Sequence, residues 1–195
     1  MKKLILSLML LVPMLLMAQN QESLETVEQH LTFKGIPIDG TLQEVVSKLE
    51  SQNFILKKQY DTKAVLEGTF ANEKCQLLLA TTPKSKKVYT ILVLFEESDS
   101  WYSLKSDYNK LKEQLKQKYK VKPDVVEKFY DPYYEGDGYE LQAFRKNKGF
   151  YISTFELENG EIGLYIASEV RLQYTDKINS EINESEKNAK TYDDL

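Results

Sequence analysis

Short strand-like runs separated by tight turns dominate this sequence, and each block of runs follows one amphipathic helix. Hairpin turns join antiparallel neighbours, whereas parallel neighbours need a crossover of a dozen residues or more. Each helix has one apolar face to bury, and the sheet has at least one face to cover. We therefore expect an α+β fold in which both helices pack on one side of an antiparallel sheet.

The first helix is predicted directly after an extended run from His30 to Ile38 and the turn signal Asp39-Gly40. Thr41 and Glu44 have the spacing of a capping box, in which each side chain accepts a hydrogen bond from the other residue's backbone N–H. The next apolar residues recur at helical spacing and predict one buried face: Leu42, Val45, Val46 and Leu49. We expect this helix to end near Gln52.

An antiparallel meander is predicted after this helix. Its strand-like runs are 54–60, 63–70, 73–82 and 88–96, separated by turn signals at Asp61-Thr62, Ala71-Asn72 and Pro83–Lys87. The three lysines of the last turn have two interpretations, an anion-binding patch or a solvated hairpin tip. The hairpin tip is the commoner role for such a cluster.

A second amphipathic helix is predicted from Ser100 to Lys120, with an apolar stripe at helical spacing: Trp101, Leu104, Tyr108, Leu111, Leu115 and Tyr119. Pro123 ends it, and Asp124 to Phe129 is expected to add a short helical turn. The remaining runs predict three more strands, at Tyr139–Lys146, Phe150–Glu158 and Glu161–Gln173, with Asn159-Gly160 as a hairpin signal.

Together these runs predict a sheet of about seven to eight strands with two helices packed on one face. The order of helix then strands occurs twice, which suggests a duplicated α-β-β-β(-β) unit with halves 30–98 and 99–174. The length of 195 residues suits one domain, predicted to span 30–174. Residues 19–29 are polar and expected to be flexible. From 175 to 195 the chain is polar and charged, so we expect a helical or frayed tail and a core that ends at Tyr174.

Residues 1–18 have the pattern of a secretory signal peptide. Lys2 and Lys3 precede an apolar run from Leu4 to Leu16, and cleavage is expected near Ala18. The run is too short for a membrane span and is followed at once by polar residues, so we expect no stable span after leader removal. The mature protein is then exported, to the periplasm or the cell exterior.

Composition excludes several classes of function. Lys and Arg number 26 against 30 Asp and Glu, so no basic surface for nucleic acid is expected. His30 and Cys75 are the only residues of their types, too few for a His/Cys metal site. Gly-rich phosphate loops and nucleophile elbows are missing as well. We therefore expect no cofactor and no catalytic residues, a small buried thiol at Cys75, and a surface or capping role for His30.

The most unusual stretch runs from Phe129 to Tyr139, where aromatic rings alternate with carboxylates. Four residues there are candidate partner-binding residues because tyrosine is enriched at contact sites: Tyr130, Tyr133, Tyr134 and Tyr139. The carboxylates of Asp131, Glu135 and Asp137 could instead bind calcium, although the spacing of an EF-hand loop is not there. An ordinary solvated connection, the commonest use of such a segment, is the third interpretation.

The order of elements resembles the β-lactamase-inhibitor-protein-like architecture of tandem helix-plus-antiparallel-sheet units. The stretches that carry this resemblance are Val88–Phe95 followed by Ser100-Trp101, and Tyr174–Asn179 near the end. It covers roughly Phe33 to Tyr174, while Met17-Ala18-Gln19 resembles the leaders of exported proteins of Bacteroidota-type bacteria. The resemblance implies a sheet whose helix-free face is concave and available to a protein partner. It carries over no individual binding residue.

We therefore expect a non-enzymatic, exported binding module of the bacterial cell envelope. Its partner is expected to be another envelope protein or a glycan, bound through the exposed face of the sheet and the tyrosine-rich loop. One alternative is an envelope enzyme acting through Asp, Glu or Tyr, for example on carbohydrate. A second alternative is a structural component that assembles with itself. The sequence leaves the oligomeric state and the identity of the exposed face open.

Overall fold

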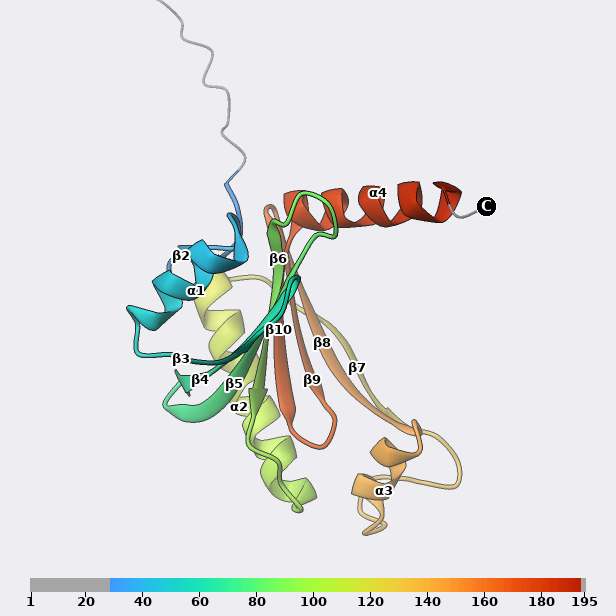
Figure 1. Ribbon diagram of the computed structural model, residues 1–195. Coiled ribbons are helices and arrows are strands. Elements are labelled where there is room, and N and C mark those ends of the chain that lie inside the picture. Colours follow the sequence, from blue (N-terminus) through green and yellow to red (C-terminus); the bar gives the residue numbers. More distant parts are fainter. Residues whose placement is uncertain (1–28, 194–195) are drawn as a thin grey trace, which may run out of the picture.

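The computed structural model describes residues 29–193 and has an α+β fold, an eight-stranded antiparallel sheet with helices packed against it (Figure 1). The expected leader and nearly all of the polar segment after it fall in residues 1–28, outside the described part of the chain. The elements, in chain order, are β1 (Thr32–Phe33), β2 (Ile36–Pro37), α1 (Leu42–Glu50), β3 (Ile55–Gln59), β4 (Lys63–Phe70), β5 (Glu73–Thr81), β6 (Val88–Phe95), α2 (Trp101–Tyr119), β7 (Asp124–Phe129), α3 (Glu140–Arg145), β8 (Gly149–Leu157), β9 (Gly160–Ile166), β10 (Val170–Asp176) and α4 (Lys177–Asp193).

The sheet is built from two similar units. The strand order is β3-β4-β5-β6-β10-β9-β8-β7, and every neighbouring pair is antiparallel. The first unit is α1 followed by β3 to β6, and the second is α2 followed by β7 to β10, with α3 inserted between β7 and β8. The last strand of each unit pairs with the other, β6 with β10, at the centre of the sheet. The predicted repeat of helix then strands is therefore present in the order of elements, with four strands in each unit.

Helices α1 and α2 form where the sequence predicts them and lie on the same side of the sheet (Figure 1). The capping box of α1 is complete: the Glu44 N–H donates to Thr41 Oγ1 over 3.4 Å, and the Thr41 N–H donates to Glu44 Oε2 over 2.8 Å. Ser100 caps α2 by accepting a hydrogen bond from the Ser103 N–H at 3.2 Å. The apolar stripes of both helices are buried against the sheet.

The prediction for residues 124–129 was wrong, because this segment is the edge strand β7 and not a helical turn. It pairs with β8 in register from Asp124–Thr154 to Phe129–Gly149. Val125 and Val126 are β-branched and favour a pleated strand, and the neighbouring β8 supplies the hydrogen bonds that a lone segment lacks.

The run 139–146 was also mispredicted, since it contains the short helix α3 in place of a strand. Its sequence, Glu-Leu-Gln-Ala-Phe-Arg, consists mainly of good helix formers. Ala143 is buried, and the Glu140 carboxylate accepts a hydrogen bond from the Gly136 N–H at 2.8 Å. These contacts fix the helix against the loop that precedes it.

The single long strand predicted for 161–173 is two strands, β9 and β10, joined by a tight turn. The Ala167 N–H donates to the Glu169 carbonyl over 2.9 Å, and the Glu169 carboxylate binds Ser168 and Arg171. The sequence has no glycine or proline at this turn, and the polar contacts that form it give no sequence signal. The break between the two strands therefore could not be predicted. The hairpin signalled by Asn159-Gly160 does form, with its turn at Glu158 and Asn159.

The apolar core ends at Tyr174, as predicted, but buried polar groups continue beyond it through Asp176 into α4. Asp176 is fully buried and accepts hydrogen bonds from the backbone N–H groups of Leu31 (2.8 Å) and Asn179 (2.9 Å). The Asn179 side-chain amide donates to the carbonyl of Val88, at the start of β6 in the first unit, over 3.0 Å. The polar tail is therefore helical and begins inside the domain, and it projects away from α1 (Figure 1). Buried polar groups of this kind carry no hydrophobic signal in the sequence.

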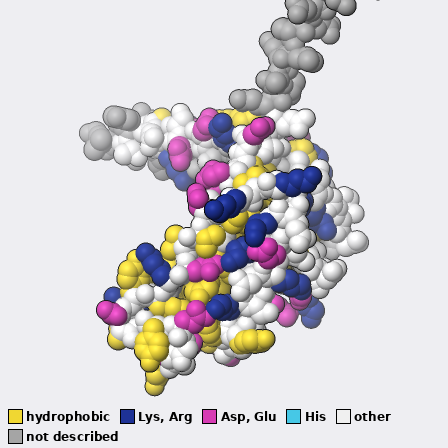
Figure 2. Space-filling view, turned by 180° about the vertical axis from the view of Figure 1, so that it is seen from behind, with side chains coloured by type: hydrophobic (Ala, Val, Ile, Leu, Met, Phe, Trp, Pro, Cys, Tyr) yellow, Lys and Arg dark blue, Asp and Glu magenta, His cyan; other side chains and the backbone are white. Residues whose placement is uncertain are grey.

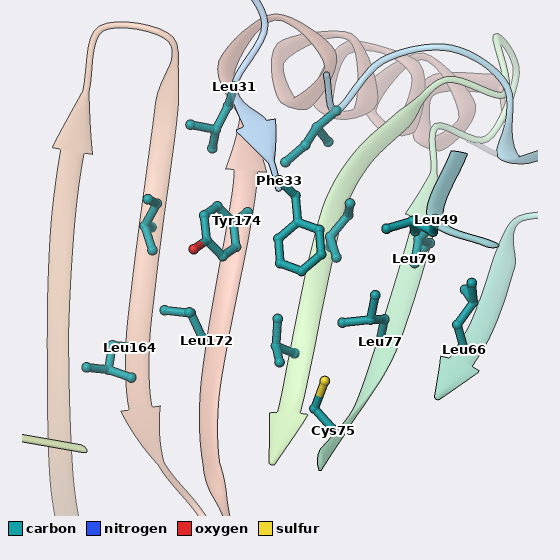
Figure 3. Packing of buried hydrophobic residues seen from close by; sticks show 14 of the residues in the cluster. Leu31, Phe33, Leu49, Leu66, Cys75, Leu77, Leu79, Leu164, Leu172 and Tyr174 are labelled. Carbon is teal, nitrogen blue, oxygen red and sulfur yellow. The ribbon is translucent and has the colours of Figure 1, made fainter. Parts of the chain in front are cut away.

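Phe33, from the short β1–β2 hairpin, stands at the centre of the apolar core (Figure 3). Its ring is fully buried, with its centroid 5.0 Å from that of Phe70 and 5.2 Å from that of Tyr174. Tyr174 belongs to the second unit and Phe70 to the first. The N-terminal hairpin thus packs across both units at once.

Replacing Phe33 with Ala should lower the free energy of unfolding by about 3–5 kcal/mol, because it removes a large buried ring and leaves a cavity between the two units. Chemical denaturation followed by tryptophan fluorescence measures this change. Tyr102→Ala is the matched control, since Tyr102 is 83% exposed and its truncation should change stability by no more than about 0.5 kcal/mol. Equal effects of the two variants would contradict the central placement of Phe33.

Candidate functional site

The candidate site is the face of the sheet opposite α1 and α2, here called the helix-free face. Because side chains alternate along a strand, the strand register places one residue from each of the eight strands in a single row across it. This row, from edge to edge, is Ile55, Glu67, Gln76, Leu94, Arg171, Tyr165, Ile152 and Val126. The row crosses both units without interruption.

Apolar side chains of the helix-free face are open to solvent. Ile152 and Val126, a cross-strand pair on β8 and β7, are 37% and 43% exposed, and Ile55 at the other edge is 63% exposed. Leu94 and Tyr165 are partly exposed. A second row carries Gly163 beside Gln173 and Thr154, and only the Glu161 carboxylate would come within 4 Å of a Cβ atom there. The face therefore has free space above Gly163, beside the central row.

Arg171 is the one cation in the central row. Its Nε donates to Glu169 Oε1 over 2.6 Å, and its guanidinium lies 6.0 Å from the centroid of the Tyr165 ring. A second ion pair, Lys57–Glu67 at 2.9 Å, lies near the β3 edge. An apolar centre that contains Tyr and Arg, with a further ion pair toward the rim, is an arrangement found at protein contact surfaces.

Two glutamates face each other at one end of the same face. Glu161 on β9 and Glu156 on β8 form a directly opposed cross-strand pair. Burial raises the pKa of Glu161 above its ordinary value, and the charge of Glu156 raises it further. Like charges opposite each other destabilise an antiparallel pair. This corner of the face therefore carries a local electrostatic strain.

The structure spreads the four predicted tyrosines over two surfaces. Tyr130 lies at the end of β7 on the helix-free face, 5.6 Å from the Phe150 ring and beneath the Lys128 ammonium group. Tyr134 and Tyr139 protrude from the loop, 66% and 61% exposed, and Tyr133 is partly buried. No ring contact among the described residues joins two of these four. Figure 2 shows hydrophobic side chains gathered at the end of the molecule that carries α3 and this loop.

Two of the three carboxylates of the β7–α3 loop, those of Glu135 and Asp137, bind groups of the chain itself. Glu135 binds Lys105 and accepts a hydrogen bond from the Tyr151 hydroxyl at 3.1 Å, and the Lys105 contact holds the pKa of Glu135 below its ordinary value. Asp137 accepts hydrogen bonds from the N–H groups of Tyr134 (3.0 Å) and Tyr139 (2.7 Å). Within residues 29–193, no three His, Cys, Asp or Glu side chains converge as metal ligands. The loop thus has an ordered frame from which the rings of Tyr134 and Tyr139 protrude.

The sequence also drew attention to Cys75, His30 and the lysines of the turn at 83–87, and the structure shows what surrounds each of them. Cys75 is buried as predicted, and burial raises the pKa of its thiol to about 11. The His30 Nδ1 atom lies 3.0 Å from Asp176 Oδ1, beside the buried start of α4. At the lysine-rich turn, Lys86 and Lys87 pair with Asp61 and Asp39, at 2.5 Å and 3.3 Å. These pairs favour a solvated turn over an anion-binding patch.

The central row of the helix-free face was not found from the sequence. Val126 was assigned to a helical turn, and Tyr165 and Arg171 to one continuous strand, so their alternation could not be traced to a common face. The β-branched pair Val125-Val126 was the available signal for β7.

No protein-family model, curated protein or solved structure matches this chain. Among the described residues, none of the helices is both long and apolar enough to cross a membrane.

Replacing Glu161 with Gln should raise the melting temperature at pH 7 by about 1–2 °C. The raised pKa means that the ionised carboxylate costs stability above its folded pKa, and that this cost vanishes below the unfolded pKa. The gain from Glu161→Gln should therefore shrink as pH falls toward 4. Calorimetry from pH 4 to 8 measures both. Glu158→Gln in the adjacent exposed turn is the control, and a gain that grows in acid would contradict this interpretation.

Proposed function

We propose that this protein is a non-enzymatic, exported binding module that binds a protein partner on its helix-free face. The observation that carries this proposal is the central row on that face, where Leu94, Tyr165, Ile152 and Val126 remain open to solvent around Arg171. No described helix or loop of the chain covers them. A contiguous exposed apolar surface is costly unless something binds to it.

The composition of the row supports a protein as the partner. Tyrosine and arginine dominate the binding energy of protein interfaces because they combine a large contact area with hydrogen-bonding groups. Tyr165 and Arg171 are neighbours in the row and already contact each other, so their side chains are ordered before binding. Preordered side chains lose less conformational entropy when a partner docks.

The β7–α3 loop extends this proposed contact surface. Tyr130 continues the helix-free face at the end of β7, and Tyr133 and Tyr134 follow on the same loop. The internal hydrogen bonds of Glu135 and Asp137 hold the loop in shape. The resemblance to the β-lactamase-inhibitor-protein-like architecture, which implies a partner-binding sheet face, points in the same direction.

The direct test uses tagged protein beginning at Gln19 as bait in an envelope extract. Two variants probe the surface: Ile152→Thr with Tyr165→Thr on the face, and Tyr133→Ala with Tyr134→Ala on the loop. Threonine keeps the strand preference of the positions it enters. Tyr102→Ala is the control, since it removes an exposed ring from α2.

The proposal predicts one protein retained in near-stoichiometric amount by the wild type and by the control. The face variant should bind it at least about tenfold more weakly, the loss typical when a central contact residue is truncated. Equal retention by the face variant, or retention of no protein by the wild type, would contradict the proposal. A glycan array with the same proteins would then test the carbohydrate alternative.

A further inference from the structure

The outer edge of β7 is an open strand with a self-complementary sequence. Residues Asp124 to Lys128 are all exposed, and the strand has no bulge and no proline within it. The opposite edge of the sheet differs, because β3 is interrupted by a register shift between Leu56 and Lys58 and carries Lys57 and Lys58. Bulges and lysines are the usual devices that protect an edge from pairing. Only the β3 edge has both.

The hydrogen-bond pattern shows which β7 groups are unpaired within the sheet. The Tyr130 N–H donates to the Lys148 carbonyl over 2.7 Å, which turns Tyr130 toward β8. Orientation alternates along an antiparallel strand, so Val126 and Lys128 also turn toward β8. The backbone N–H and C=O groups of Val125 and Glu127 therefore point away from the sheet.

We propose that β7 pairs with β7 of a second copy of this chain about a two-fold axis at Val126. In an antiparallel pair, residues with outward N–H and C=O groups must face each other. That condition allows the axis to pass through any residue of β7. An axis at Asp124, Glu127 or Lys128 places two like charges opposite each other, and an axis at Val125 or Phe129 leaves Lys128 without a partner residue in the strand.

The register centred on Val126 satisfies the remaining groups. It sets Val125 opposite Glu127 of the second copy, which forms about four backbone hydrogen bonds across the axis. It also sets Asp124 opposite Lys128 of the second copy, twice by symmetry, and both lie on the helix-free face with Val126. Opposite charges in a directly facing pair stabilise a sheet. Val126 meets its own copy between these two charge pairs.

The dimer joins the helix-free faces of two copies into one surface. Val126 ends the central row of each copy, so the row continues directly from one chain into the other. This proposal rests on the backbone and charges of the edge and not on the proposed partner-binding function. Either one can fail without the other.

The first test measures mass by light scattering and sedimentation, with protein from Gln19 onward at concentrations up to about 100 μM, where weak edge pairing is detectable. The wild type should approach twice the mass of one chain. Lys128→Glu should weaken association about tenfold or more, because it places two acidic pairs across the axis. The double variant Asp124→Lys, Lys128→Glu should restore it, while Lys58→Glu on the opposite edge should change nothing.

A second test locates the axis without relying on charge. In this register the two Val126 Cα atoms lie about 4.5 Å apart, within the range that a disulfide spans. Oxidised Val126→Cys protein should form a covalent dimer, and Val125→Cys should not, because Val125 faces Glu127 of the other copy. The native Cys75 is buried and does not compete.

A wild type that remains single-chain at about 100 μM, or a charge swap that fails to restore association, would overturn the proposal and leave this edge to a strand of another protein.

Discussion

The pairing of β6 with β10 is the interaction on which the rest of the structure depends. Each unit packs one helix, α1 or α2, against four strands. Without the β6–β10 pair, each four-stranded half of the sheet would end at an open edge in the middle of the core. Across this central pair the fully buried side chains form one row from Leu66 and Leu77 through Val93 to Leu172 and Leu164. A hydrogen bond from Thr90 Oγ1 to the Tyr174 carbonyl, 3.0 Å long, also crosses it. The N-terminal hairpin, through Phe33, packs over the same junction.

The same junction creates the proposed binding surface. Strand alternation sends Leu94 and Arg171, which face each other across β6 and β10, to the side opposite the buried row. The central row of the helix-free face therefore exists only while the two units are joined. The surface belongs to neither unit alone, because apolar residues come from both sides of the junction and Arg171 lies beside it. The proposed β7-to-β7 dimer would extend the helix-free face in the same way, by one further antiparallel strand pair at its edge.

Sequence patterns were sufficient for the elements whose signals are local. The capping box at Thr41 and Glu44, the helical stripe of α2 and the alternation in β4 to β6 each predict their element because period and caps agree. The second unit was harder, since β7 depends on its pairing with β8, and the turn before β10 depends on the buried Glu169 carboxylate. The role of Asp176 could not be predicted for a related reason: its partners, Leu31 and His30, lie more than 140 residues away in the chain. The candidate tyrosines were identifiable from composition, whereas the central row required the register of all eight strands.

Native-state hydrogen exchange at the β6–β10 junction tests this account most directly. If the two units form one cooperative sheet, the slowest amides of β6 and β10 exchange only through global unfolding, with the same free energy and denaturant dependence as the slowest amides of β5 and β9. The account predicts this equality. Junction amides that exchange through a separate opening of lower free energy, while β5 and β9 stay protected, would show two independent units and contradict a single continuous face.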